Sequence, residues 1–195
     1  MTMFRNRSAA TIIFAFSFLF PAAASAQRDF LTPQEVEIVR DAQEIDTRIE
    51  VLTQAIDRRF AVMNLDVNSP KIKQKGDWGE LPQGSRPELF LDIRRILQKA
   101  VDDIDNLAER PESAVAPDPA KRKGDTSYAV LFPKAVRELA SAAQRYTPVL
   151  RSQLDTAGAG GEKGSILVTL DLCQQIIDAV VKLPPEPQKK GSKKT

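Results

Sequence analysis

Apolar side chains recur every three or four positions along most of the chain, and no long segment alternates apolar and polar residues. This spacing puts apolar side chains on one face of an α-helix, whereas a β-strand would require a period of two. The glycines fall largely between the periodic segments, as expected for residues that end helices. The pattern therefore predicts an all-α protein with helices over residues 33–63, 87–109, 127–156 and 165–182.

Two of these helices are expected to begin with the same local signal. Thr32 is followed by Pro33 and Glu35, and Ser85 is followed by a proline and then by Glu88. A hydroxyl residue at the N-cap and a glutamate three positions later form a capping box, and proline is favoured in the first turn. Both starts are therefore predicted to be fixed by local hydrogen bonds.

Four helices with apolar faces favour an antiparallel, up-down-up-down four-helix bundle over residues 27–183. The connections at 65–84 and 110–126 are longer than bundle loops usually are. Pro148 lies inside the third helix and is expected to bend or split it, because an interior proline removes one backbone hydrogen bond.

The ends of the chain differ from its body. Arg5 and Arg7 precede an apolar run at 9–20 and the small residues Ala24-Ser25-Ala26, a pattern typical of a secretory signal peptide cleaved after Ala26. The apolar run is too short to span a bilayer, so we expect an exported protein, periplasmic or extracellular, without a transmembrane segment after cleavage. Residues 184–195 carry four lysines and are expected to form a flexible basic tail.

Composition narrows the possible chemistry. The 195-residue chain contains no histidine and a single cysteine, Cys173, which falls on the apolar face of the fourth helix. Without histidine, the chain lacks the usual general base and the commonest metal ligand. Cys173 has no base or cation beside it on its helix, so we expect it to be a buried, unreactive thiol. The carboxylates near Asp103 are expected to form a solvated face with ordinary ion pairs, including one to Lys99. We therefore expect no enzyme activity, no metal and no cofactor.

A few basic and aromatic residues remain as candidates for contact with a ligand or partner. Arg59 interrupts an apolar face, where it either presents its guanidinium to an anionic ligand or, the interpretation that we prefer, extends to solvent at the bundle end. The loop lysines next to Trp78 could bind an anionic polymer, although a tryptophan that covers the core is the simpler expectation. The full set of candidates is Arg59, Lys71, Lys73, Lys75, Trp78, Lys121, Arg122 and Lys123.

The first functional hypothesis is therefore a non-catalytic binding or structural protein of the periplasm or cell envelope, whose partner is a protein or an anionic envelope component. The alternative is a small-ligand-binding protein with a pocket at a bundle end, under the loop at 65–84. Nucleic acid is not expected as a partner, because the helices carry no basic stripe and the protein is expected to be exported.

Overall fold

The computed structural model describes residues 29–70, 78–114, 127–158 and 160–185. This part of the chain is compact and all-helical, as predicted. The elements in chain order are α1 (Pro33–Asp41), α2 (Ile45–Val62), α3 (Arg86–Glu109), the short 3-10 helix η1 (Pro111–Ala114), α4 (Tyr128–Leu154), α5 (Gly161–Ala179) and the 3-10 helix η3 (Val180–Lys182).

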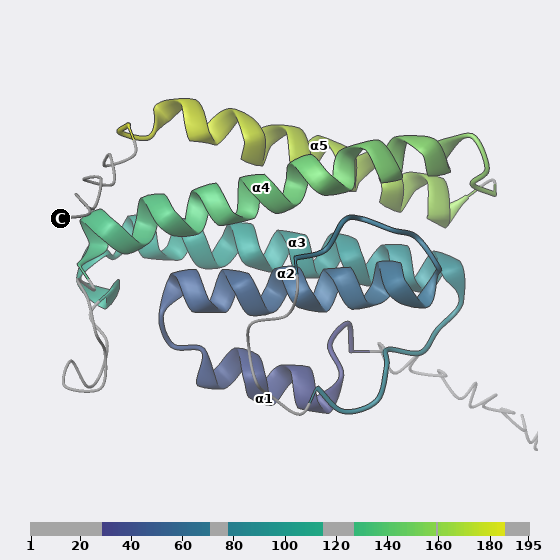
Figure 1. The fold of residues 1–195 in the computed structure, drawn as a ribbon, viewed down its shortest axis with the longest axis horizontal. Helices are drawn as coiled ribbons and strands as arrows, with labels where there is room; N and C mark the ends of the chain where they lie inside the picture. The colour runs from purple at the N-terminus through teal and green to yellow at the C-terminus, as the bar shows by residue number, and fades with distance from the viewer. Residues whose placement is uncertain (1–28, 71–77, 115–126, 159, 186–195) are drawn as a thin grey trace, which may run out of the picture.

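The four long helices, α2 to α5, share one apolar core. The helix α2 contacts α3 and α4, α5 contacts α3 and α4, and the short helix α1 packs on the outside of α2. Consecutive α-helices run in opposite directions (Figure 1). The described residues therefore form five α-helices, one more than the four that the sequence pattern predicts.

The extra helix arises from a break at residues 42–44, which corrects the prediction of one helix over 33–63. Ala42 leaves the helical conformation, with φ −77° and ψ 79°, and its carbonyl accepts a hydrogen bond of 2.9 Å from Arg48 Nε. Glu44 then adopts an extended conformation and caps α2. Because Ala42 and Ile45 are both buried, the apolar pattern continues across the break and conceals it.

The remaining boundaries follow the sequence closely. Both capping boxes form, with Thr32 N to Glu35 Oε2 at 2.9 Å and Ser85 N to Glu88 Oε2 at 2.7 Å. Of the two outcomes expected at Pro148, a bend or a split, the split does not occur, since α4 continues from Tyr128 to Leu154. The last long helix begins at Gly161, one turn earlier than predicted, after Gly160 with φ 113°.

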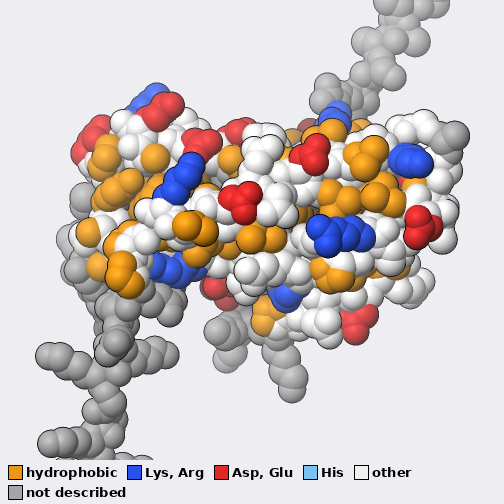
Figure 2. All heavy atoms as spheres, turned by 90° about the horizontal axis from the view of Figure 1, so that it is seen from above, with side chains coloured by type: hydrophobic (Ala, Val, Ile, Leu, Met, Phe, Trp, Pro, Cys, Tyr) orange, Lys and Arg blue, Asp and Glu red, His pale blue; other side chains and the backbone are white. Residues whose placement is uncertain are grey.

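The helix α5 has an unusual balance of hydropathy and burial. Among the described residues, Gly161–Lys182 is the one helical segment long and apolar enough to cross a membrane, by length and composition alone. Only a third of its most apolar window is buried within the protein. Its packing against α3 and α4 leaves Leu167 and Val168 exposed. Figure 2 shows hydrophobic side chains at the surface on the side of the molecule where α4 and α5 lie.

Candidate functional site

An apolar groove runs between α3, α4 and α5, near the end of the molecule where α5 stops. It encloses about 580 Å³ and takes its floor from all three helices. The apolar residues that line it are Val101 and Ile104 from α3, Phe132, Val136 and Leu139 from α4, and Leu172, Ile176, Ala179 and Leu183 from α5 and the segment that follows it.

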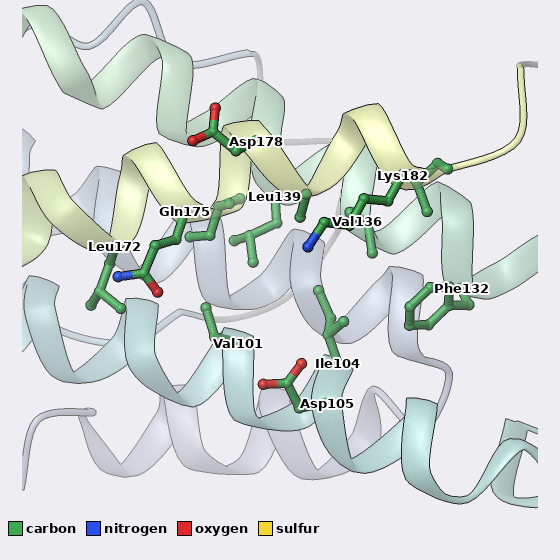
Figure 3. A pocket seen from close by; sticks show the side chains of 13 residues that line it. Val101, Ile104, Asp105, Phe132, Val136, Leu139, Leu172, Gln175, Asp178 and Lys182 are labelled. Atoms are coloured by element: carbon green, nitrogen blue, oxygen red, sulfur yellow. The ribbon is translucent and has the colours of Figure 1, made fainter.

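Polar groups stand at the rim of this groove. Figure 3 shows the Asp105 carboxylate and the Lys182 amino group approaching the groove from α3 and from η3. Asp178 and Gln175 complete the polar lining. In Figure 3 the Asp178 carboxylate points away from the groove, and it accepts a hydrogen bond of 2.9 Å from Gln174, which does not line the groove. The groove thus combines an apolar floor with the carboxylate of Asp105, the amino group of Lys182 and the amide of Gln175, a pattern suited to an amphipathic ligand.

Arg59, the first of the sequence candidates, does not extend to solvent as we expected. Its side chain is 1% exposed and its guanidinium pairs with Glu35, which is fully buried. Nη1 lies 2.6 Å from Glu35 Oε1 and Nη2 lies 2.7 Å from Oε2, and the carbonyls of Ala55 and Phe30 accept further hydrogen bonds of 2.7 Å each. Since all these contacts come from within the protein, Arg59 ties the start of α1 to α2.

Arg58, which the sequence analysis overlooked, completes this connection. It donates to Glu35 Oε1 at 3.1 Å and to the carbonyls of Trp78 and Glu80 at 2.8 Å and 2.5 Å. Its guanidinium carbon also lies 5.4 Å from the centre of the Trp78 ring, which packs against the core. Trp78 therefore packs on the core beside a buried arginine, as expected for a tryptophan that covers the core.

The other sequence candidates, Lys71, Lys73, Lys75, Lys121, Arg122 and Lys123, lie outside the described residues, as does the predicted signal peptide. A shallow cavity of about 650 Å³ does lie beside the beginning of the first long loop, where Asp57 and residues 64–69 line it. Neither Arg59 nor Trp78 is part of that lining.

The buried titratable groups outside the groove are engaged in structure. Arg145 lies 3.4 Å from Asp57 Oδ2, and burial raises the pKa of the Asp57 carboxyl while Arg145 opposes that shift. The buried Tyr146 hydroxyl donates to the Thr53 carbonyl at 3.1 Å, and burial raises its pKa well above the usual value. The Tyr146 hydroxyl is thus held by protein atoms, whereas Asp57 pairs with Arg145 and also lines the cavity of about 650 Å³.

Cys173 is a buried thiol and the acidic segment of α3 forms an ordinary ion pair, as expected for both. Burial raises the pKa of the Cys173 thiol to about 12, which opposes formation of the reactive thiolate. Lys99 Nζ lies 3.1 Å from Asp103, an ion pair one helical turn apart. Within the described ranges, no group of three or more cysteine, aspartate or glutamate side chains is arranged to hold a metal ion.

Comparison of the chain with protein-family models, with curated proteins and with solved structures found no match.

Proposed function

We propose that this chain is an exported, non-catalytic interaction protein, and that the groove between α3, α4 and α5 binds an amphipathic segment of another protein. The observation that carries the proposal is the apolar floor built by three separate helices and left open to solvent. A concave, mostly apolar site of about 580 Å³ with a few polar groups beside it is typical of a binding site.

The chemistry of the rim specifies the segment further. The Asp105 carboxylate and the Lys182 amino group reach the groove, and Asp178 adds a second carboxylate on the outer side of α5, so the surroundings of the groove carry a net negative charge. An apolar side chain that enters the groove contributes roughly 1.5–3 kcal/mol when it is fully buried. A basic residue beside it is attracted by the rim, which steers association and fixes orientation more than it adds affinity. The best ligand is therefore a segment that presents an apolar side chain next to a basic one.

The fold suits a binding role. We propose that α2 to α5 act as an up-down-up-down four-helix bundle, with α1 added outside α2, and that the bundle holds the groove in place before a partner arrives. A preformed site loses less conformational entropy on binding than a flexible one does. In this proposal α5 belongs to the water-soluble domain, and its packing on α3 and α4 supports that role.

The test is a binding titration with labelled helical peptides of identical apolar pattern, one made of leucine and lysine and the other of leucine and glutamate. The chain without its first 26 residues should bind the lysine peptide at least about tenfold more tightly. Substitution Ala179→Trp fills the groove and should reduce that affinity by about tenfold or more. The matched control is Val168→Trp on the same helix, at a 43% exposed residue that does not line the groove.

Equal affinity for the two peptides, or equal loss with both tryptophan variants, would remove the groove as the binding site. Circular dichroism and thermal unfolding of each variant separate a filled groove from a misfolded chain.

A second candidate is small-ligand binding in the cavity beside residues 64–69, which lies next to the first long loop. Its lining includes the polar side chains of Asp57, Asn64 and Ser69, which could hold a polar ligand. A series of sugars and amines should then raise the unfolding temperature of the native chain and leave that of Ser69→Trp unchanged. If no compound shifts the unfolding temperature of the native chain, this candidate fails.

A further inference from the structure

We infer that the segment received by the groove is the Val181–Lys182 corner of a second copy of this chain, so that the protein forms a two-fold symmetric dimer. This inference rests on the proposed function and names the partner of the same groove.

The apolar residue that the groove requires is present on its own rim. Val181 is 86% exposed, the highest value among the exposed large hydrophobic residues of the described chain. It lies in η3, between Val180, which packs against the core, and Lys182, which lines the groove. Because 86% of Val181 faces solvent, its own groove does not receive it.

The backbone around Val181 is held in place. Leu183 N donates to the Val180 carbonyl at 3.0 Å, and Arg137 donates to the Pro184 carbonyl. The segment that carries Val181 is thus anchored on both sides, so presenting this apolar side chain to a partner requires no further ordering of the backbone. Binding then avoids part of the usual entropic cost.

Charge complementarity favours a second copy over an unrelated partner. The same surface presents a positive group, Lys182, and a negative group, Asp105, at the groove, and a second negative group, Asp178, on the outer side of α5. A two-fold axis brings the same surface of two copies together and makes every contact reciprocal. In the proposed dimer, Lys182 of each copy faces the carboxylates of the other copy. A two-fold symmetric interface requires a surface that is complementary to itself. This surface has a projecting valine, an apolar groove and charges of both signs.

The basic tail at 184–195 supplies charge without a large apolar side chain such as valine, since it consists of Pro, Glu, Gln, Lys, Gly, Ser and Thr. It fits the carboxylates of the rim but not the floor of the groove. We therefore assign the groove to Val181 of a second copy, and the tail becomes an outcome to be tested.

The first experiment is sedimentation equilibrium of residues 27–195 over a range of concentrations. The native chain should dimerise, and Val181→Asp should raise the dissociation constant by about a hundredfold, because a symmetric dimer loses two buried valines worth about tenfold each. Val168→Asp places the same charge on another exposed valine that does not line the groove and should leave the dimer intact.

The second experiment reverses charges and mixes the variants. Lys182→Glu alone and the double variant Asp105→Lys/Asp178→Lys alone should each be monomeric, because every facing pair would carry like charges. Mixed in equal amounts they should form a heterodimer, since both sets of facing pairs are then opposite in charge. A merely structural effect of these substitutions would not be repaired by mixing.

A native chain that stays monomeric and still binds the lysine peptide would overturn the dimer and leave the proposed function standing. A native chain that is monomeric and binds neither peptide would overturn both. A dimer unchanged by Val181→Asp would place the interface elsewhere. A further variant replaces Lys189, Lys190, Lys193 and Lys194 by glutamine. If this variant no longer dimerised while Val181→Asp still did, the tail would be the segment that binds the groove, and the inference would be wrong.

Discussion

Glu35 and Arg59 form a doubly hydrogen-bonded ion pair in the interior, with oxygen-to-nitrogen distances of 2.6 Å and 2.7 Å. In one continuous helix these residues, 24 positions apart, would be separated by about 36 Å. They meet because the break at 42–44 turns α1 back along α2. The ion pair and the break therefore depend on each other.

Removing the buried acid should be costly. Glu35→Ala leaves two buried arginines, Arg58 and Arg59, without their shared carboxylate, and should reduce the free energy of unfolding by about 3–5 kcal/mol. Glu37→Ala removes an exposed carboxylate paired with Arg40 and should cost less than about 1 kcal/mol. Urea denaturation monitored by circular dichroism measures both, and equal costs would refute the special role of Glu35.

Local signals in the sequence predicted the start of two helices correctly. Each capping box is complete within four residues, so its hydrogen bonds require no knowledge of the fold. The break after α1 could not be read in the same way, because its cause is distant: Glu35 gains Arg58 and Arg59 only when α1 reverses direction. The continuous apolar spacing across Ala42 and Ile45 favoured one helix instead.

The candidate site was harder to predict than the fold. Ile104, Phe132 and Leu139 each lie on an apolar helix face, where the sequence marks them as core residues. They line a groove only because three helix surfaces meet imperfectly near the end of α5. One signal was available, since Val181 follows the last apolar turn of α5 and precedes the prolines that end the helical segment.

Arg58 should control the environment of the only tryptophan. Arg58→Lys retains the charge but cannot donate in the same planar arrangement to the carbonyls of Trp78 and Glu80, so we expect a loss of about 1–3 kcal/mol. In the folded Arg58→Lys variant, the fluorescence emission of Trp78 should shift to longer wavelength, because its ring becomes more hydrated. Arg40→Lys, at an exposed position, should change neither quantity. An unchanged spectrum in Arg58→Lys would show that the contact does not hold the ring.

Gly79 and Gly164 should respond in opposite ways to alanine. Gly79 has φ +58°, and an added Cβ would lie 2.6 Å from Gln34 Cγ, so Gly79→Ala should destabilise the protein by about 1–2 kcal/mol. Gly164 lies within α5 with open space around it, so Gly164→Ala should stabilise by about 0.5–1 kcal/mol. Thermal unfolding compares the two variants, and the same sign for both would contradict the assigned backbone conformations.

Export can be tested on the intact chain. Expressed in a bacterium with its first 26 residues, the protein should appear outside the cytoplasm with Gln27 as its first residue, since Ala24 and Ala26 form the expected cleavage site. Terminal sequencing and cell fractionation measure this. Replacing Ala24 and Ala26 by arginine should block cleavage, and a cytoplasmic protein with an intact N-terminus would contradict the proposal of export.

Cys173 should make stability fall in alkaline solution. Burial raises the pKa of its thiol from 9.0 to about 12, so below pH 9 the thiol is protonated in both the folded and the unfolded chain and adds no pH dependence. Between pH 9 and 12 the unfolded chain loses this proton while the folded chain keeps it. Stability therefore decreases as pH rises, by about 1.4 kcal/mol at pH 10. Cys173→Ala should lack this part of the decrease, so the difference in unfolding free energy between native chain and variant should shrink from pH 8 to pH 10 by that amount. A difference that stays constant over this range would show that the thiol ionises as readily in the folded chain as in the unfolded one.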